Sequence, residues 1–252
     1  MKKFIKNLLF LLGQFLGFFR LKIFKNIRIL IYTGMYKHKF KSFGEKTIIR
    51  PTFNYLLGAK YISIGDFSKI GKNVILSAWD KYKNQNFTPE ITIGNHSNIG
   101  DRSHVTCINK IIIGNNVGMG REILITDNSH GNGDISEFHE RTGTRPLVSP
   151  GPVIIEDNCW IGEKCCILPA VTIGRGSTLG ASSVVRTSIP PYSIVVGNPA
   201  KVIGFVGTPE EIFEKEKELY PEEERIPFVK LQRNYEKYYL KRLKEIVTYI
   251  KP

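Results

Sequence analysis

The chain has 252 residues, 42% hydrophobic and 11% aromatic, which excludes a disordered tail and allows one sizeable core. Its formal net charge of +13 points to an anionic partner: nucleic acid, a lipid surface or an anionic ligand. Residues 1–50 hold 12 Lys and Arg against one Glu, whereas the other 202 residues hold 24 against 22. The basic character therefore belongs to the N-terminal segment.

The first 42 residues interleave these charges with Phe, Leu and Ile. Their apolar run, Leu8 to Phe19, is 12 residues long and contains Gln14, so it is too short to span a bilayer. No small-residue cleavage site follows it, unlike in a signal peptide. We expect residues 1–42 to form a basic amphipathic helical arm. It either contacts an anionic membrane or packs on the protein or a neighbouring subunit, and the pattern leaves both open.

An aliphatic residue or Met recurs every six residues over most of the remaining chain, and nine of these positions are followed by Gly. The fifteen positions are Ile64, Ile70, Leu76, Ile93, Ile99, Val105, Ile113, Met119, Ile125, Ile155, Ile161, Ile167, Ile173, Leu179 and Val185. This period fits neither an amphipathic helix nor a half-buried strand. It indicates short strands joined by tight corners, with one aliphatic side chain per strand directed into a narrow core.

Three hexads make one turn of a triangular parallel β-solenoid, so the repeat predicts about five turns. The turns are 64–81, 93–110, 113–130, 155–172 and 173–190. Residues 82–92 and 131–152 interrupt the period and are expected to leave the solenoid as loops. Residues 206–252 follow as a helical extension that begins at the capping Thr208 and is divided by Pro221 and Pro227.

The segment PVIIEDNCWIGEKCCILPAVTIGRGSTLGASSVVRTSIPPYSIVVGNPAKVIG, from Pro152, resembles the end of sugar O-acetyltransferases of the maltose and galactoside acetyltransferase type. SIPPYSIVVGNPAKVI is its most specific part, and the earlier FGEKTIIRP and YISIGDFSKIGKNV are similar to enzymes that decorate bacterial surface polysaccharides. These are hexapeptide-repeat acyltransferases. The resemblance implies a mainly β fold, the left-handed parallel β-helix, over residues 43–205.

The resemblance also implies the site. His130, in ITDNSHG, ends the third turn immediately before the loop 131–152, which is where the family has its catalytic His. We assign it as the general base for the acceptor hydroxyl. Asn109, Asp127 and Asn128 are candidates for binding the acceptor. Turn chemistry is an equally good explanation for Asp127 and Asn128. His139, within the loop, is the rival base.

The implied donor substrate is acetyl-CoA. Residues matching the family's donor site are Trp160, Gly162, Ala181, Ser183, Arg186 and Lys201. Ser182 stands where the family usually has Gly, and Arg186-Thr187 where it often has Thr-Lys. We expect no metal, because γ-class carbonic anhydrases on the same solenoid need a close His pair. The pairs here, His96/His104 and His130/His139, are eight and nine residues apart.

The sequence therefore predicts a coenzyme A-dependent O-acetyltransferase that acetylates a sugar hydroxyl in surface polysaccharide biosynthesis. The alternatives are an N-acyltransferase of a nucleotide-linked amino sugar and a non-catalytic solenoid scaffold with a membrane-binding arm. The acceptor would be a sugar, a sugar nucleotide or a lipid-linked sugar, and the family resemblance implies a homotrimer. No nucleic-acid motif is present. Four cysteines without a CxxC pair indicate reduced thiols, so we expect a cytoplasmic protein, with the arm at the inner face of the membrane.

Overall fold

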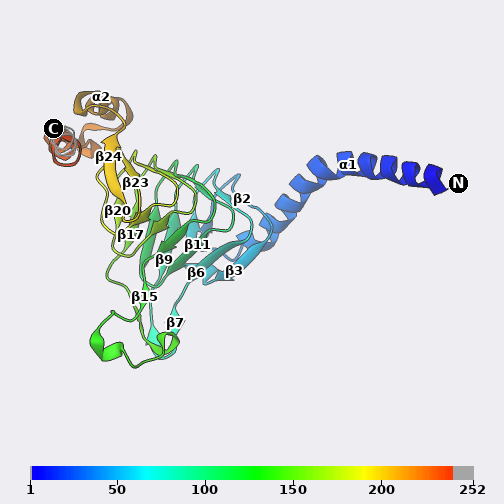
Figure 1. The fold of residues 1–252 in the computed structure, drawn as a ribbon, viewed down its shortest axis with the longest axis horizontal. Coiled ribbons are helices and arrows are strands. Elements are labelled where there is room, and N and C mark those ends of the chain that lie inside the picture. Colours follow the sequence, from blue (N-terminus) through cyan, green and yellow to red (C-terminus); the bar gives the residue numbers. More distant parts are fainter. Residues whose placement is uncertain (1, 241–252) are drawn as a thin grey trace, which may run out of the picture.

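A computed structural model describes the backbone of residues 2–240, and the side chains of this range except residues 2–3, 16 and 18–25. A long helix, α1 (Lys2–Lys37), projects from one end of a stack of short strands. The helices α2 (Pro209–Leu219) and α3 (Phe228–Tyr235) lie at the other end (Figure 1). The protein is therefore mainly β, with helical segments before and after the strands.

The strands form three stacks, here called walls 1, 2 and 3, in which neighbours run parallel except for the last strand of wall 2. Wall 1 consists of β1 (Ser42–Phe43), β4 (Ile62–Ile64), β9 (Glu90–Ile93), β12 (Lys110–Ile113), β17 (Val153–Ile155) and β20 (Thr172–Ile173). Wall 2 consists of β2 (Ile48–Ile49), β5 (Lys69–Ile70), β10 (Asn98–Ile99), β13 (Gly118–Met119), β18 (Trp160–Ile161), β21 (Thr178–Leu179), β23 (Ser193–Val196) and the antiparallel β24 (Lys201–Phe205). Wall 3 consists of β3 (Phe53–Leu57), β6 (Val74–Ala78), β11 (His104–Cys107), β14 (Leu124–Thr126), β19 (Cys166–Ile167) and β22 (Val184–Val185).

From β1 to β22 the chain passes through walls 1, 2 and 3 in rotation, interrupted only by the hairpin and loop between walls 3 and 1. This is the order expected of a parallel β-helix. All fifteen positions of the six-residue period are buried, with exposures of 4% or less, so the predicted core is confirmed. Burying one Ile or Leu side chain contributes about 1.5–3 kcal/mol, so this column of side chains dominates the stability of the stack.

The corners between walls 1 and 2 explain why Gly and Asx residues follow the core positions. The side chain of Asn95 accepts a hydrogen bond from the backbone N–H of Asp66 at 2.7 Å, and Asn115 does the same for Asn95 at 2.9 Å. Asp157 accepts from the N–H of Asn115 at 2.7 Å. A Cβ at Gly65 would collide with the backbone of the next corner, at Gly94 and Asn95. The coils therefore approach more closely than a side chain at these positions would allow.

The structure contains one coil more than the five that the period predicts. The extra coil, formed by β1, β2 and β3, precedes Ile64. It breaks the six-residue spacing because a register shift between Phe53 and Tyr55 inserts a residue, so that Leu56 pairs with Leu76 in the inward position. A bulge of this kind moves every later side chain by one place, which hides the coil from a strict six-residue count.

The C-terminal end of α1 packs on this first coil. The Thr33 hydroxyl accepts a hydrogen bond from the backbone N–H of Ile49 at 2.9 Å. The Tyr32 hydroxyl accepts one from the N–H of Phe53 at 2.7 Å, and the Tyr36 ring lies 5.3 Å from the Phe53 ring. These contacts satisfy backbone donors that have no further coil to pair with. They fix the helix to the end of the stack.

The C-terminal extension begins as predicted. Thr208 and Glu211 form a capping box at the start of α2, and Pro221 and Pro227 lie between α2 and α3. The short helix η4 (Glu222–Glu224) joins the two, and the π-helical turn η5 (Glu236–Leu240) ends the described part. The buried Glu216 holds α2 in place because it accepts hydrogen bonds from Tyr192, Arg175 and the N–H of Ile226. Residues 206–240 thus contain two α-helices, α2 and α3, and residues 241–252 lie outside the described chain.

Candidate active site

The segments that interrupt the six-residue repeat all lie at one edge of the stack, between walls 3 and 1. Each time the chain leaves wall 3 for wall 1 it crosses this edge. Residues 79–89 cross it after β6, Ile108 and Asn109 after β11, and residues 127–152 after β14. Both segments expected to leave the solenoid as loops therefore emerge from the same edge, with one coil between them.

These two segments are joined to each other. The first forms a hairpin of β7 (Lys81–Tyr82) and β8 (Gln85–Asn86), and β15 (Ser129–His130) pairs with β16 (Leu147–Val148) in the second. The Tyr82 hydroxyl donates to the carbonyl of Gly143 at 2.8 Å, and the Gln85 amide accepts from the N–H of Leu147 at 2.8 Å. Figure 1 shows the two leaving the stack together, with the short helices η2 (Ile135–Glu137) and η3 (Thr142–Thr144) in the longer one.

His130 is the last residue of β15, opposite Leu147 of β16, and its side chain is exposed. The Tyr82 ring meets the imidazole edge-on, with ring centroids 5.6 Å apart. Trp79 lies beyond Tyr82 at 6.3 Å, also edge-on. Paired strands fix the backbone of His130 while solvent reaches its ring, which suits a group that exchanges a proton with a substrate.

A pocket of about 500 Å³ lies between the hairpin and β16, and Leu147, the strand partner of His130, is one of its lining residues. It is lined by Asn86, Phe87, Thr88, Ile108, Asn109, Leu147, Val148 and Ser149. The exposed Asn109 side chain donates to the Ser149 hydroxyl at 3.4 Å, a long hydrogen bond that a ligand could replace. The structure therefore places Asn109 at a cavity with both polar and apolar walls, on the edge that holds His130.

Asp127 occupies a different environment from the one expected of an acceptor ligand. Its side chain is fully buried, and its carboxylate accepts from the N–H of Ile108 at 3.0 Å and of Asn109 at 2.8 Å. It also accepts from the Asn128 amide at 2.9 Å and the Cys107 thiol at 3.1 Å. Burial raises the pKa of the Cys107 thiol, and the negative charge of Asp127 raises it further. The sequence left two explanations for Asp127 and Asn128, acceptor binding and turn formation. These hydrogen bonds fit turn formation, because they support the backbone that carries Asn109.

The expected donor residues lie along wall 2 and its edge with wall 3. Trp160 points outward from wall 2 and is 56% exposed, and a Cβ at Gly118 on the next strand would lie 2.6 Å from its ring. Gly162 is buried at the following corner. The indole therefore packs over the Gly118 backbone, and its exposed part is a suitable surface for an apolar ligand arm.

The segment from Ala181 to Ser183 forms the next corner between walls 2 and 3. Ser182 has φ +61°, which explains why Gly is usual there. The buried Ser183 hydroxyl donates to the carbonyl of Gly180 at 2.7 Å, so its side chain is used in packing the corner. Arg186 and Lys201 are exposed and make no ion pair within residues 2–240. Both guanidinium and ammonium are free to meet phosphate groups.

A single chain does not bring the two sets of residues together. His130 and Asn109 lie on the edge between walls 3 and 1, as does Arg186, which follows β22. Trp160 is on wall 2 and Ala181 on its edge with wall 3, so wall 3 separates them from His130. Within residues 2–240, no three His, Cys, Asp or Glu side chains gather as metal ligands.

Residues 152–187 match the family described as bacterial transferase hexapeptide, six repeats. The match covers β17 to β22, the end of the stack in which the period runs without interruption. It bears out the resemblance on which the sequence assignment rests.

Among curated proteins, this chain is 32% identical over 124 residues to the provisionally named lipopolysaccharide biosynthesis O-acetyl transferase WbbJ of Escherichia coli K12. That match covers 46% of this chain and 61% of WbbJ. A provisionally named acetyltransferase of Staphylococcus aureus COL is 48% identical over 66 residues, covering 26% of this chain and 32% of the relative. The chain thus spans less than two thirds of these relatives.

Among solved structures, the chain is similar to a variant of AntD, an N-acyltransferase from Bacillus cereus in complex with dTDP-4-amino-4,6-dideoxyglucose and coenzyme A. The TM-score is 0.56 at 23% identity, with 73% of this chain and 93% of AntD covered. At this identity the similarity concerns the fold. It agrees with the parallel stack of hexapeptide coils described above.

Proposed function

We propose that the protein is a coenzyme A-dependent acyltransferase that transfers acetyl to a sugar hydroxyl during surface polysaccharide biosynthesis. The observation that supports this best is the placement of His130. It is an exposed imidazole on a paired strand, at the edge that also carries two hydrogen-bonded loops and a pocket with polar and apolar walls. The similarity to proteins named as O-acetyl transferase and acetyltransferase supports the same reaction class.

In this proposal His130 takes the proton from the acceptor hydroxyl as the hydroxyl oxygen attacks the thioester carbonyl carbon. Asn109 and the pocket beside β16 orient the sugar, and Asp127 keeps the backbone of Asn109 in place. Backbone N–H groups near His130 stabilise the negative charge on the carbonyl oxygen. The C–S bond then breaks and His130 returns its proton to the departing thiolate. General base catalysis of this kind contributes about 10²–10⁴-fold to the rate.

The donor acetyl-CoA fits the residues of wall 2. The exposed Trp160 and the Gly162 and Ala181 corners would border the pantetheine arm, with backbone close enough to contact it. Lys201 would meet the phosphates, together with Arg186 from the edge that also carries His130. Ser183 would act through its packing, since its hydroxyl is already bonded to Gly180. No metal takes part in this proposal.

The separation of the donor and acceptor residues supports a homotrimer. One row of side chains on wall 3 points outward, and its members pair in register from strand to strand. The row consists of Tyr55, Ile75, His104, Leu124, Cys166 and Val184. Tyr55 is exposed and the other five side chains are half-buried. Burial lowers the pKa of His104, so the row is uncharged near pH 7. If wall 3 faces a threefold axis, the edge between walls 3 and 1 of one subunit lies against the edge between walls 2 and 3 of the next subunit. His130 of one protomer would then face the wall 2 edge of the next.

Placing a charge in this row tests the assembly. We expect Leu124→Lys to convert the trimer to folded monomers and to abolish activity, because three ammonium groups would meet at an apolar interface. Multi-angle light scattering gives the mass and circular dichroism the fold. Ile112→Lys, which changes an outward residue of wall 1, is the matched control and should leave the mass unchanged. Monomeric wild-type protein with full activity would refute the shared site.

The finer architecture follows from the same family resemblance. The stack would be a left-handed β-helix, and the chain would divide into an arm (1–42), a catalytic solenoid (43–205) with the loop 131–152, and an extension (206–252). The cysteines form no disulfide in the described part of the chain, which supports a reducing compartment, the cytoplasm.

The reaction is tested by incubating the full chain with acetyl-CoA and panels of sugars, sugar nucleotides and amino sugars, while thiol release is measured. We expect release that depends on an acceptor with a free hydroxyl. Release only with nucleotide-linked amino sugars would instead establish the N-acyltransferase alternative. No release with any acceptor, together with no binding of coenzyme A by calorimetry, would favour the non-catalytic scaffold.

A further inference from the structure

Arg145 carries a charge that no described side chain neutralises. It lies between η3 and β16, in the loop that leaves the edge with His130. Its Nε is buried without a hydrogen-bond partner, and within residues 2–240 its guanidinium makes no hydrogen bond or ion pair. The two Nη groups are not buried, so a ligand can reach them. An unpaired buried donor destabilises the folded state, so a role in packing does not explain this arginine.

The Arg145 side chain lies against the residue that follows His130. The N–H of Gly131 donates to the carbonyl of Pro146 at 2.7 Å, next to the pair of His130 and Leu147. A Cβ at Gly131 would lie 3.1 Å from Cδ of Arg145, and the φ of Gly131 is +77°. The glycine thus supplies both the left-handed backbone and the space that bring the arginine close to the strand of His130.

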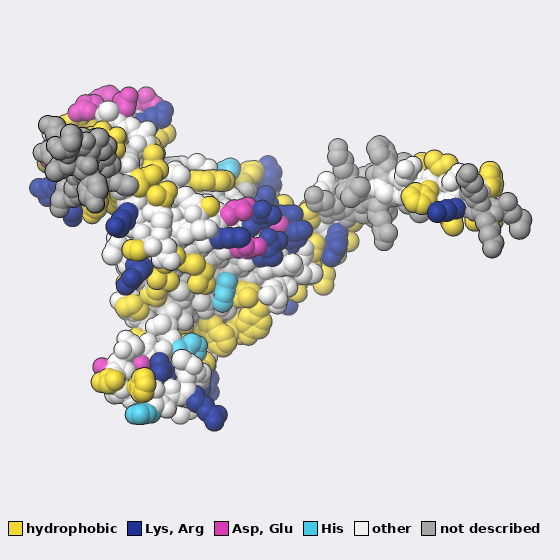
Figure 2. Space-filling model, in the orientation of Figure 1, with side chains coloured by type: hydrophobic (Ala, Val, Ile, Leu, Met, Phe, Trp, Pro, Cys, Tyr) yellow, Lys and Arg dark blue, Asp and Glu magenta, His cyan; other side chains and the backbone are white. Residues whose placement is uncertain are grey.

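The acidic side chains of the two loops are largely occupied. Residues 79–89 and 127–152 contain five Asp and Glu against four Lys and Arg. Four of the five carboxylates accept hydrogen bonds within the protein, namely those of Asp80, Asp127, Asp134 and Glu137. Of the four basic side chains in these ranges, only Lys83 makes a hydrogen bond, to the carbonyl of Gly143 at 2.7 Å. Lys and Arg side chains lie at the surface of these loops (Figure 2), and the charge left unpaired there is mainly positive.

The spacing of His130 and Arg145 suits a sugar. Leu147, opposite His130, lines the pocket, and Arg145 precedes it by two residues with an extended backbone, φ −63° and ψ 149°. Two residues of extended chain span about 7 Å, comparable with a hexose ring. The Tyr82 hydroxyl, bonded to the carbonyl of Gly143 at 2.8 Å, fixes the segment before Arg145. A sugar hydroxyl at His130 and a charged group at Arg145 can therefore belong to one sugar unit.

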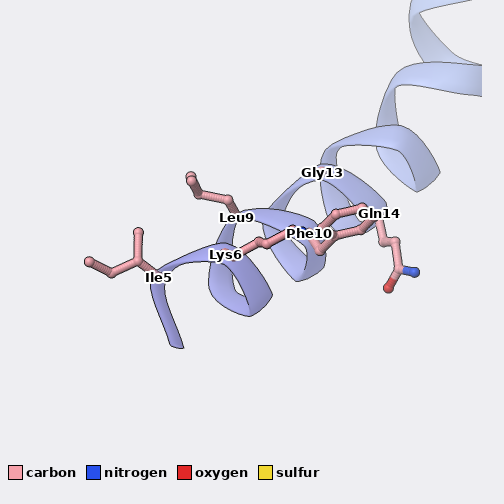
Figure 3. Close-up of a pocket in the computed structure, with 6 residues that line it drawn as sticks. All are labelled: Ile5, Lys6, Leu9, Phe10, Gly13 and Gln14. Carbon is pink, nitrogen blue, oxygen red and sulfur yellow. The ribbon is translucent and has the colours of Figure 1, made fainter. Parts of the chain in front are cut away.

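The cavity along α1 is not a comparable site. It measures about 810 Å³, and the described residues that line it all belong to α1 (Figure 3): Ile5, Lys6, Leu9, Phe10, Gly13 and Gln14. Exposed side chains of a single helix do not enclose a ligand. Among the residues that the structure describes, no helix is long and apolar enough to cross a membrane. The membrane contact expected of residues 1–42 stays a prediction.

We infer that the acceptor sugar carries an oxyanion, a phosphate or a carboxylate, which the guanidinium of Arg145 binds while His130 takes the proton from a hydroxyl. A guanidinium binds either group through two parallel N–H···O bonds, which orient the sugar and select its charge. Arg145 thereby determines specificity and exchanges no proton. The inference rests on the proposed function, because it names the class of acceptor that the same site takes.

Acetyl transfer to matched neutral and anionic acceptors tests the inference. Thiol release from saturating acetyl-CoA is measured with glucose and galactose as free sugars, as 1-phosphates, as UDP-sugars and as uronic acids. We expect kcat/KM for at least one anionic form to exceed that for its free sugar by about 10–100-fold, which corresponds to one charge-assisted hydrogen bond. Preference for the phosphorylated forms assigns a phosphate to the acceptor, and preference for the uronic acids assigns a carboxylate.

Arg145→Gln should remove this preference. We expect kcat/KM for anionic acceptors to fall by about 10–100-fold, through KM, and that for free sugars to stay within about twofold. Arg145→Lys keeps the charge without the planar fork and should retain part of the preference. Arg141→Gln, which changes an exposed arginine of the same loop, is the matched control and should leave the preference unchanged. The midpoint of thermal unfolding should not fall in Arg145→Gln, because the buried Nε has no partner to lose.

Equal rates for free and anionic sugars, unchanged in Arg145→Gln, would overturn the inference and leave acetyl transfer standing. A loss that is the same for every acceptor, with a raised KM for acetyl-CoA, would assign Arg145 to the donor and also overturn it. Absence of thiol release with every acceptor would refute the proposed reaction, and calorimetry with the 1-phosphates and uronic acids then decides on the site. Binding that Arg145→Gln abolishes would support the oxyanion site, and no binding would refute it.

Discussion

Replacing His130 with Ala is expected to lower kcat/KM for acetyl transfer by about 10²–10⁴-fold, because the acceptor hydroxyl would lose its proposed general base. We expect the effect on kcat, since the pocket proposed to orient the acceptor is lined by other residues. The midpoint of thermal unfolding stays within about 2 °C of wild type, because an exposed side chain contributes little to stability. Steady-state kinetics and a thermal melt measure the two quantities on the same preparation.

His139→Ala is the matched control for this experiment. His139 is also exposed and edge-on to an aromatic ring, Phe138, with centroids 5.3 Å apart, but it lies within the loop rather than on a paired strand. We expect its activity to remain within about twofold of wild type. If His139→Ala were inactive and His130→Ala fully active, the roles assigned to the two histidines would have to be exchanged.

Replacing Asp127 with Asn has the largest expected effect on stability. The change keeps the size of the side chain but places an NH₂ group where the N–H groups of Ile108 and Asn109 now donate. One buried donor loses its acceptor, and the loss costs about 2–4 kcal/mol. Chemical denaturation should show this decrease. Acetyl transfer should also fall, through KM for the acceptor, because the backbone of Asn109 is released.

Asp66→Asn provides the comparison. Asp66 occupies the corner position that Asn95 and Asn115 occupy in later coils, where the amide oxygen makes the same hydrogen bond to a backbone N–H. The substitution should therefore cost less than about 0.5 kcal/mol. If Asp127→Asn were equally mild, the buried carboxylate would not be the support for Asn109 that its hydrogen bonds indicate.

The fold was largely predictable because its core depends on one short period. Each of the fifteen aliphatic positions is buried, and the corner Gly and Asx residues contact the next coil. The first coil was missed because the register shift at Phe53–Tyr55 adds a residue, which a periodic count cannot detect. The cap of Thr33 and Tyr32 on that coil involves residues 16 to 21 positions apart, which no local pattern indicates.

The site was predictable only in part. The end of the third turn immediately before a long loop marked His130, but Tyr82 and Gln85 were missed because they lie more than 40 residues away from it in sequence. A signal for them existed: residues 82–92 and 131–152 both interrupt the repeat after its third hexad, so both leave the same edge. The role of Asp127 was left open because a short polar segment fits both a turn and a ligand site, and only its burial separates them.

The central claim is that this chain transfers an acetyl group from coenzyme A to a sugar hydroxyl with His130 as the base. Mass spectrometry of the acceptor after incubation with isotopically labelled acetyl-CoA tests it most directly. We predict one labelled acetyl ester on the sugar with wild-type protein and a trace with His130→Ala. Equal labelling by both proteins would contradict the role of His130, and label in coenzyme A alone with every acceptor would contradict the reaction itself.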